Sequence, residues 1–253
     1  MELRLDGHTA LVTGANGGLG SHFASTLAKA GARVAISARR VESLRDVEQQ
    51  IRAAGGQVAS IPLDVTQRES VVAAFEAAAA QLGPVTVVVN NAGVAVTKPL
   101  LEQTDKDWLD VIEVNLNGAW RVAQEAARHM VNHGRGGSIV NIASILGLRV
   151  SAQVPGYAAS KAALIHLTKA MALELARHRI RVNALAPGYV ETSINRDFFA
   201  ADSGQALIKR IPQRRIGNPQ ELDGALLLLA SDAGSYATGT VLAVDGGQLV
   251  NTL

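Results

Sequence analysis

The sequence predicts an α/β fold, a doubly wound sheet of about seven parallel strands with helices on both faces. Two observations lead to this prediction. Short β-branched runs alternate with longer Ala-rich stretches of helical period, which is the pattern of strand–helix–strand units. Several runs are apolar on both faces, such as Val-Thr-Val-Val-Val at 85–89, as expected for strands that helices cover on both sides. Since no Pro- or Ser-rich linker and no internal repeat divides the chain, residues 1–253 are expected to form a single domain.

Each element follows from this alternation. The strands are expected at residues 9–13, 33–37, 57–63, 85–89, 138–142, 181–186 and 241–244. Helices are expected between them, for example at residues 43–54, 68–81, 107–133 and 157–178. The segment 189–219, which follows the sixth strand, is irregular and longer than most connections. We expect it to be a substrate-binding lid, and a surface insertion is the alternative.

The composition excludes several classes of protein. Hydrophobic residues make up 48% of the chain and charged residues 18%, which supplies ample material for a core. The net charge is +2 and the 24 Lys and Arg residues are scattered, so no nucleic-acid partner is expected. The absence of cysteine excludes a disulfide framework and a thiol nucleophile. Residues 1–7 lack the pattern of a signal peptide, and no apolar run reaches the roughly 20 residues of a membrane span. We therefore expect a cytoplasmic protein with no membrane partner.

Two histidines raise the question of a metal. His129 and His133 are four residues apart on a predicted helix. Neither an HExxH motif nor an obvious third ligand accompanies them, and cationic side chains near a helix end suit its dipole. No metal site is expected.

A glycine-rich turn follows the first predicted strand, in the run Thr13-Gly14-Ala15-Asn16-Gly17-Gly18-Leu19-Gly20. Glycine is needed where a backbone turns sharply or must approach a pyrophosphate closely, and the start of the next helix then holds the anion. Any tight turn can use glycines, but this one lies at the first strand-to-helix junction, where a dinucleotide site requires it. The expected contacts are Gly14, Asn16, Gly18, Leu19 and Gly20.

The end of the second strand indicates which dinucleotide is bound. The strand ends Ile36-Ser37-Ala38-Arg39-Arg40, with no carboxylate before Glu42. A carboxylate there accepts from the ribose 2′-hydroxyl of NAD, whereas guanidinium matches the 2′-phosphate of NADP. NADP(H) is therefore favoured, with NAD(H) as the weaker alternative, and solvated surface charges are the other explanation of Arg39 and Arg40.

Tyr157 and Lys161 are spaced four residues apart, so they lie one turn apart on the same face of a helix. A nearby ammonium and an oxidised nicotinamide both favour the phenolate, which brings a phenol closer to the pKa that carbonyl reduction needs. Ser144 follows the fifth strand, where its hydroxyl can donate to a substrate oxygen. Asn115 lies within an apolar helical stretch and is either a structural amide or part of a polar network. Each of these residues alone also fits a structural role.

With these motifs in order, the chain resembles the short-chain dehydrogenase/reductase family, whose members have a single Rossmann-like domain of about this length. The resemblance runs nearly end to end. The motifs that carry it are Thr13-Gly14-x-x-x-Gly18-x-Gly20, Asp64, Asn90-Asn91-Ala92-Gly93, Asn115, Ser144, Tyr157-x-x-x-Lys161, Pro187-Gly188 with Thr192, and Val244-Asp245-Gly246-Gly247.

The resemblance implies a catalytic tetrad of Asn115, Ser144, Tyr157 and Lys161. Asn115 would hold a water in a proton relay to Lys161, and Tyr157 and Lys161 would also contact the cofactor at the nicotinamide ribose. Tyr157 would protonate the substrate oxygen.

The resemblance also implies the other cofactor contacts. Asp64 and Val65 match the adenine contacts. Asn90, Ala92 and Gly93 match the adenosine side. Pro187, Gly188, Val190 and Thr192 match the contacts to the nicotinamide carboxamide. Many NADP-type members have a basic residue in the glycine turn where this chain has Gly17, which leaves Arg39, with Arg40 and Asn16, to select the 2′-phosphate.

The expected function is NADP(H)-dependent hydride transfer between the nicotinamide and a small-molecule ketone or aldehyde, or the corresponding alcohol. One alternative is a 3-oxoacyl-[acyl-carrier-protein] reductase. An alternative from another class is a non-catalytic NADP(H)-binding regulator, against which the complete tetrad argues. The resemblance implies a homotetramer or homodimer built on the helices at 107–133 and 157–178.

Overall fold

The computed structural model describes residues 3–192 and 196–250, and seven parallel strands form one sheet. The strand order is β3-β2-β1-β4-β5-β6-β7, and every neighbouring pair is parallel. The sequence predicted each strand to within one residue at either end. The strands are β1 (Thr9–Thr13), β2 (Arg33–Ala38), β3 (Val58–Pro62), β4 (Val85–Asn90), β5 (Gly137–Ile142), β6 (Ile180–Pro187) and β7 (Val241–Val244).

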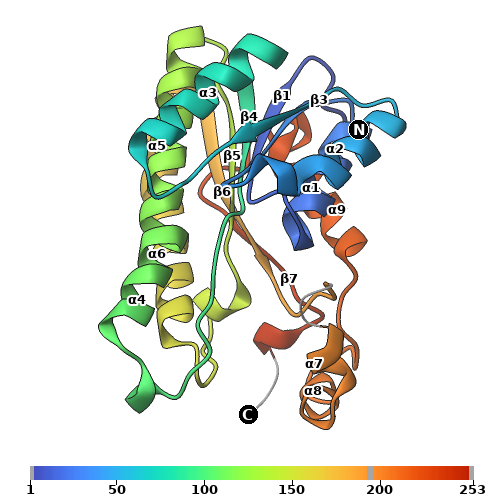
Figure 1. Cartoon of the computed structure of the whole chain (residues 1–253), viewed down its shortest axis with the longest axis vertical. Helices are drawn as coiled ribbons and strands as arrows, with labels where there is room; N and C mark the ends of the chain where they lie inside the picture. Colours follow the sequence, from blue (N-terminus) through green and yellow to red (C-terminus); the bar gives the residue numbers. More distant parts are fainter. Residues whose placement is uncertain (1–2, 193–195, 251–253) are drawn as a thin grey trace.

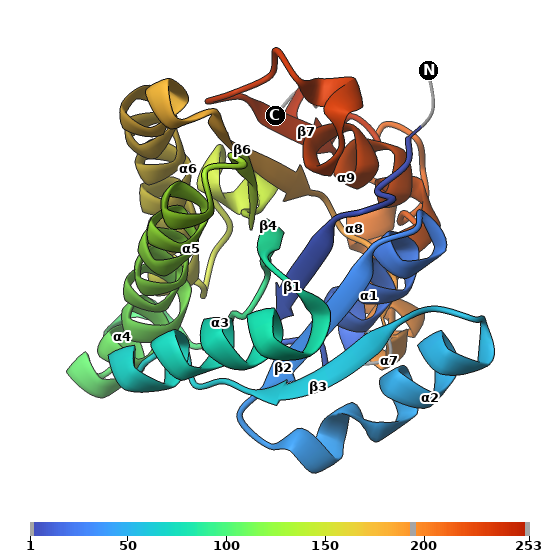
Figure 2. The ribbon, with the colours of Figure 1, turned by 90° about the horizontal axis from the view of Figure 1, so that it is seen from above.

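Helices cover both faces of the sheet, as predicted (Figures 1 and 2). One face carries α1 (Gly18–Lys29), α2 (Arg45–Ala53) and α9 (Asp223–Ala230). The other face carries α3 (Arg68–Leu82), α5 (Ala119–His133) and α6 (Pro155–Leu175). The doubly wound arrangement places the carboxyl ends of all seven strands at one edge, where such proteins bind ligands.

Alternation along the strands divides the apolar interior into two main cores. On β1, Ala10 and Val12 belong to the core under α1 and α9, whereas Leu11 belongs to the core under α3 and α5. Successive strand residues point to opposite faces, so one short apolar strand supplies both cores. All three side chains are fully buried.

The helix expected at 107–133 consists of three segments. It begins earlier, as α4 (Asp105–Ile112), continues through a π-helical segment (Glu113–Gly118) and ends as α5. Hydrophobic periodicity does not register the single extra residue of a π turn, so the expected uninterrupted helix was wrong here. Such turns occur mostly at functional sites, and this one contains Asn115.

The segment 189–219 is more ordered than predicted, because it contains α7 (Arg196–Ala200) and α8 (Asp202–Ile208). Both helices are short, and Figure 1 shows them side by side at the lower end of the molecule. Residues 193–195 of the expected lid lie outside the described residues.

Among the described residues, no helix is long and apolar enough to cross a membrane. His129 has a structural partner, since its Nε2 accepts a hydrogen bond from the Val85 N–H at 3.2 Å. Within 3–192 and 196–250, no group of three or more His, Cys, Asp or Glu side chains could hold a metal ion.

Candidate active site

A cavity of about 310 Å³ opens at the carboxyl ends of the strands. Ser144, Tyr157 and Lys161 line one side of it, and Pro187 and Thr192 line another. These residues come from the ends of β5 and β6 and from the start of α6, which are distant in sequence and meet at this edge of the sheet. We refer to this cavity as the catalytic cleft.

Lys161 is fixed at the floor of the cleft. Its side chain is 4% exposed, and its ammonium donates a hydrogen bond to the Ile142 carbonyl at 2.8 Å. The ammonium also lies 5.6 Å from the centre of the Tyr157 ring, as the one-turn spacing predicted. Burial penalises the charged form and lowers the pKa of Lys161 to about 8. The lysine is therefore poised to exchange a proton near neutral pH.

Tyr157 is the third residue of α6, where the helix dipole favours a negative charge. Burial nevertheless raises the pKa of its phenol above the ordinary value, with a smaller rise from Tyr189, while a side-chain hydrogen bond with Ser144 lowers it. The one-turn spacing predicted that the neighbouring ammonium favours the phenolate, whereas in the protein alone burial raises the pKa of the phenol. The phenol thus holds its proton, which suits a proton donor in carbonyl reduction.

Ser144 lies two residues after the end of β5 and is 8% exposed. Its Oγ accepts a hydrogen bond from the Leu146 N–H at 3.1 Å and so caps the short helical turn Ile145–Gly147. A hydroxyl that accepts from the backbone still has its own proton to donate. Ser144 can therefore donate to Tyr157 or to a substrate oxygen.

Asn115 is fully buried and makes three hydrogen bonds. Its Oδ1 accepts from the Val94 N–H at 2.8 Å, and its Nδ2 donates to the Val94 carbonyl at 2.9 Å and to Ser160 Oγ at 3.1 Å. Ser160 in turn donates to the Tyr157 carbonyl at 2.7 Å. The amide therefore links the π-helical segment to the first turn of α6, and the water-holding role implied by the resemblance stays a prediction.

Ser160 was not predicted as a site residue. Its position between Tyr157 and Lys161 could have indicated a role in the site. A small hydroxyl one turn after Tyr157 can reach the carbonyl of that residue. The serine is fully buried and joins the tetrad residues without facing the cleft as Tyr157 does.

The loop after β4 brings its backbone close to the tetrad at Gly93. A Cβ built on Gly93 would lie 3.3 Å from Asn115 Oδ1 and 3.6 Å from Lys161 Nζ. Glycine therefore lets this backbone pass between the amide and the ammonium.

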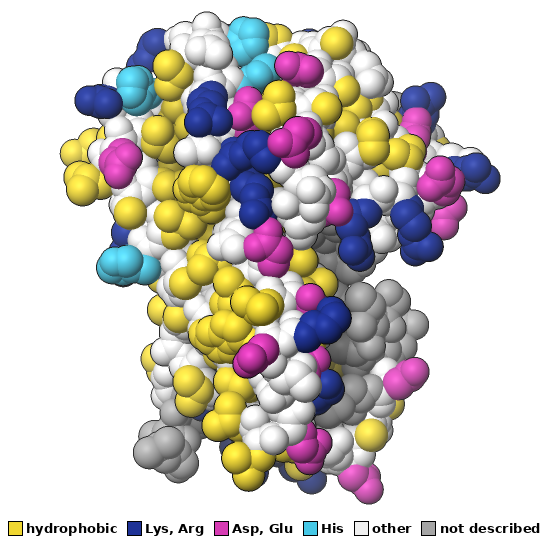
Figure 3. All heavy atoms as spheres, turned by 60° about the vertical axis from the view of Figure 1, so that its left-hand side comes forward, with side chains coloured by type: hydrophobic (Ala, Val, Ile, Leu, Met, Phe, Trp, Pro, Cys, Tyr) yellow, Lys and Arg dark blue, Asp and Glu magenta, His cyan; other side chains and the backbone are white. Residues whose placement is uncertain are grey.

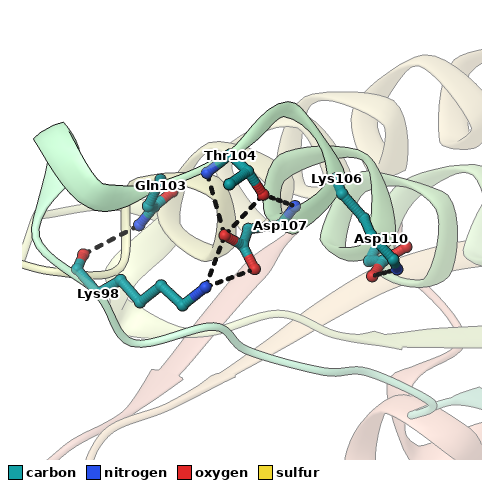
Figure 4. Close-up of polar contacts among 6 residues, drawn as sticks. All are labelled: Lys98, Gln103, Thr104, Lys106, Asp107 and Asp110. Atoms are coloured by element: carbon teal, nitrogen blue, oxygen red, sulfur yellow. Dashed lines mark hydrogen bonds and ion pairs between the residues drawn. The ribbon is translucent and has the colours of Figure 1, made fainter.

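The same loop is fastened to the start of α4 (Figure 4). Lys98 Nζ lies 2.8 Å from Asp107 Oδ2, and this carboxylate also accepts from the Thr104 N–H at 3.0 Å. Thr104 Oγ1 accepts from the Asp107 N–H, which completes a capping box. The hydrogen bonds from Lys98 and Thr104 lower the pKa of Asp107 to about 2. We refer to these contacts among Lys98, Thr104 and Asp107 as the clamp. The clamp fixes the far end of the loop, and the near end of the loop contacts Asn115.

The glycine turn after β1 has the geometry that a pyrophosphate requires. Gly14 and Gly18 have φ values of +65° and +54°, which favour glycine, and a Cβ on Gly20 would lie 2.2 Å from the Gly14 carbonyl oxygen. No side chain caps α1, so the first-turn N–H groups are left for an anion.

Thr13 and Asn91 hold this turn against the loop after β4, and neither was selected as a site residue. Thr13 Oγ1 accepts from the N–H groups of Asn91 and Ala92, both at 3.0 Å. Asn91 Nδ2 donates to the carbonyls of Thr13 and Gly14 at 3.0 and 3.1 Å. Both residues belong to the motifs quoted from the sequence, and a buried threonine at a strand end was the available signal.

Comparison with known proteins decides the family. The family model described as "Enoyl-(Acyl carrier protein) reductase" matches residues 14–248. A 2-dehydro-3-deoxy-D-gluconate 5-dehydrogenase from Escherichia coli (strain K12) is 39% identical over 246 residues, which cover 97% of this chain and 96% of the relative. A 3-oxoacyl-[acyl-carrier-protein] reductase from Thermotoga maritima is 37% identical, with 98% of this chain and 100% of the relative covered.

The solved structures agree. The crystal structure of a gluconate 5-dehydrogenase from Burkholderia cenocepacia J2315 in complex with NADP and tartrate superimposes with a TM-score of 0.94. That protein is 38% identical to this chain, and the match covers 99% of this chain and 98% of the other. This chain belongs to the short-chain dehydrogenase/reductase family.

Within this short-chain dehydrogenase/reductase, Arg39 and Arg40 follow directly on the end of β2. Both are exposed, and in the described part of the chain neither guanidinium has a hydrogen-bond or ion-pair partner. Their donors are thus available to an anion at this end of the sheet.

The other residues predicted to contact the cofactor either line the catalytic cleft or point away from it. Leu19, Gly93, Gly188, Val190 and Thr192 all line the catalytic cleft. In contrast, the Asn90 side chain points into a buried network, where it donates to the Ala119 carbonyl at 2.7 Å and to Asn141 Oδ1 at 3.2 Å. Asn90 can therefore contact a cofactor only through its backbone.

Asp64 and Val65 follow β3 at the adenine side expected from the resemblance. Asp64 Oδ1 accepts from the Thr66 N–H at 2.9 Å and from its hydroxyl at 2.8 Å, which orders the turn. Val65 packs against Gly118, where a Cβ would lie 2.7 Å from its Cγ2.

Proposed function

We propose that this short-chain dehydrogenase/reductase is an NADP(H)-dependent oxidoreductase that reduces a ketone or aldehyde, or oxidises the corresponding secondary alcohol. The observation that carries the proposal is the placement of Ser144, Tyr157 and Lys161 at one end of the cleft with Asn115 behind them. A nucleotide fits the other end, because the glycine turn leaves the first N–H groups of α1 uncapped.

The mechanism divides between the cofactor and the chain. When bound, NADPH supplies the hydride that reaches the carbonyl carbon. Tyr157 donates its phenolic proton to the oxygen, and Ser144 donates a hydrogen bond to the same oxygen as negative charge develops there. Lys161 returns a proton to Tyr157, which its pKa of about 8 permits near neutral pH. Asn115 and Ser160 hold the first turn of α6 so that these groups stay in register.

The proposed choice of NADP(H) over NAD(H) depends on Arg39, with Arg40 beside it. Guanidinium groups form paired, charge-assisted hydrogen bonds with phosphate. No carboxylate stands between Ala38 and Glu42 to accept from a 2′-hydroxyl. The two arginines are exposed and available.

The surroundings of the reaction are part of the proposal. The segment 189–219 acts as the lid of the single domain, the substrate is a small molecule, and the enzyme works in the cytoplasm. We place a homotetramer or homodimer contact on the side that carries α4, α5 and α6, where apolar side chains gather (Figure 3). The exposed residues there are Trp108, Leu109, Trp120, Val131 and Leu173.

A second candidate function is the reduction of 3-oxoacyl groups on an acyl carrier protein. The Thermotoga maritima relative and the description of the family model favour it. Rates on free ketones, acyl-CoA and acyl carrier protein separate the two candidates, and we expect the free ketone to be preferred.

The test of the proposed chemistry is Tyr157→Phe. Loss of the proton donor should lower kcat/KM for NADPH-dependent reduction by about 10²- to 10⁴-fold. Ser144→Ala is the companion variant and should give a smaller loss. Full turnover by Tyr157→Phe would contradict the role of the phenol.

A further inference from the structure

A second cavity, of about 340 Å³, adjoins the catalytic cleft. Tyr189 lines both cavities, and Ile145 and Leu146, which follow Ser144 directly, line the second. A substrate whose oxygen is held by Ser144 and Tyr157 can therefore extend past Tyr189 into this space. We refer to it as the Arg149 cavity.

The charged residues that line the Arg149 cavity are positively charged. Arg149, from the loop after β5, and Arg210, which follows α8, both line it. No Asp or Glu is found among the described residues that line it. Arg149 donates one hydrogen bond to the Gln248 carbonyl. A guanidinium has five N–H donors, so each arginine can bind a further acceptor. Two guanidiniums that line the same cavity favour an anion there.

Gln248 supplies an independent observation. Its side chain lines the same cavity and is 6% exposed, and its Oε1 has no hydrogen-bond partner among the described residues. A buried acceptor without a donor is costly and is normally satisfied. This oxygen is also closed to solvent, so a hydroxyl on a bound molecule reaches the amide only when the Gln248 side chain turns toward the cavity.

The remaining walls are largely aliphatic. Val150, Leu207 and Ile211 also line the cavity. These apolar side chains match the carbon chain of a small molecule.

We propose that the Arg149 cavity binds the carboxylate end of the substrate, which is a hydroxylated keto acid or the corresponding hydroxy acid. Arg149 and Arg210 pair with the carboxylate, and the Gln248 amide turns toward the cavity and accepts from a hydroxyl on the carbon chain. This assignment rests on the proposed function, because it places the reacting oxygen at Tyr157.

The experiment uses substrate pairs that differ only in charge. The first pair is D-gluconate and D-glucitol, which have equal chain length, with NADP⁺ as oxidant. Further pairs are keto acids with one to four methylenes between carbonyl and carboxylate, each with its methyl ester and NADPH. The wild-type enzyme should prefer the acid of at least one pair by about 10- to 100-fold in kcat/KM, as expected for a charged hydrogen-bonded pair.

Three variants and one control variant locate the effect. Arg149→Met and Arg210→Met should each reduce the acid-to-neutral ratio about tenfold or more, through KM rather than kcat. Arg52→Met, which changes an exposed arginine on α2 paired with Glu48, is the control and should keep the ratio. Gln248→Leu should reduce the preference for D-gluconate over a keto acid without hydroxyls.

Calorimetry with D-gluconate and D-glucitol on the enzyme–NADP⁺ complex gives a readout that does not need turnover. Tighter binding of D-gluconate that is lost in Arg149→Met supports the assignment. Equal kcat/KM within every pair, equal binding of the two polyols, or a preference for acetoacetyl-CoA over all free acids overturns it. If Tyr157→Phe still abolishes turnover in that event, the proposed function stands and only the assignment of this cavity fails.

Discussion

The two ends of the site differ in how the protein holds its polar groups. At the catalytic end, Asn115 and Lys161 are buried and bonded to backbone carbonyls of neighbouring loops and strands. At the adenosine end, Arg39 and Arg40 are exposed and have no partner among the described residues. The first set is ordered before any ligand arrives, and the second set is free for a ligand.

This difference separates two tasks. Proton transfer needs groups fixed to within a fraction of an ångström, and an error of about 1 Å can cost about 100-fold in rate. Selection of a phosphate needs only charge and reach at the surface, which long arginine side chains supply. Chemistry and cofactor choice should therefore respond to different substitutions.

The largest expected effect is at the rigid end. Asn115→Leu removes the partner of Val94 N–H, of the Val94 carbonyl and of Ser160 Oγ. The free energy of unfolding should fall by about 3 kcal/mol, because buried polar groups lose their partners. Turnover should fall about 100-fold as the first turn of α6 loses its support. Urea unfolding and steady-state kinetics measure both effects. Unchanged turnover would show that the amide is dispensable for positioning.

The next effect concerns Lys161 and pH. Its folded-state pKa of about 8 lies below the ordinary value of 10.5, so between these values the unfolded chain binds more protons. Stability of the cofactor-free protein should therefore rise with pH in this window. The gain attributable to Lys161 between pH 7.5 and 9.5 is about 2 kcal/mol.

The measurement is urea unfolding of wild type and Lys161→Met at both pH values. The free energy of unfolding of wild type minus that of Lys161→Met should rise with pH. The Lys106→Met variant changes an exposed lysine of α4, and its free energy of unfolding should change with pH as that of wild type does. A constant difference between wild type and Lys161→Met would mean that the lysine is not deprotonated by burial.

The smallest effect lies outside both ends, at the clamp of Figure 4. Thr104→Ala removes the capping box of α4 and should lower the free energy of unfolding by about 1 kcal/mol, while kcat stays that of wild type. Lys106→Ala, which removes an exposed pair with Asp110, is the matched control and should leave stability unchanged. A loss of kcat in Thr104→Ala would extend the rigid region to α4.

Much of this arrangement could be predicted from the sequence. Parallel strands buried on both faces leave a strong apolar signal, and Tyr157, Lys161 and the glycine turn are recognisable from spacing. The π-helical segment could not be predicted, because contacts of Asn115 with a loop 21 residues away accompany it. Nor could the inward direction of Asn90, since both faces of β4 are buried and the pattern does not distinguish them.

The electrostatics of Tyr157 were also beyond the sequence. Spacing indicated that an ammonium lies nearby, but the raised pKa results mainly from burial, which depends on the packed surroundings. The two short helices in 189–219 were missed for a similar reason, since α7 and α8 are too short for a periodic signal.

One crossed measurement tests the separation of the two ends most directly: dissociation constants for NADPH and NADH, with turnover, in Tyr157→Phe and Arg39→Ser. Tyr157→Phe should lose at least about 100-fold in turnover and keep its preference for NADPH. Arg39→Ser should lose about 10- to 100-fold in NADPH affinity, because a charged hydrogen-bonded pair to the 2′-phosphate is removed, and should keep its turnover with NADH. A strong preference of the wild-type enzyme for NADH, or loss of NADH turnover in Arg39→Ser equal to that in Tyr157→Phe, would contradict the account.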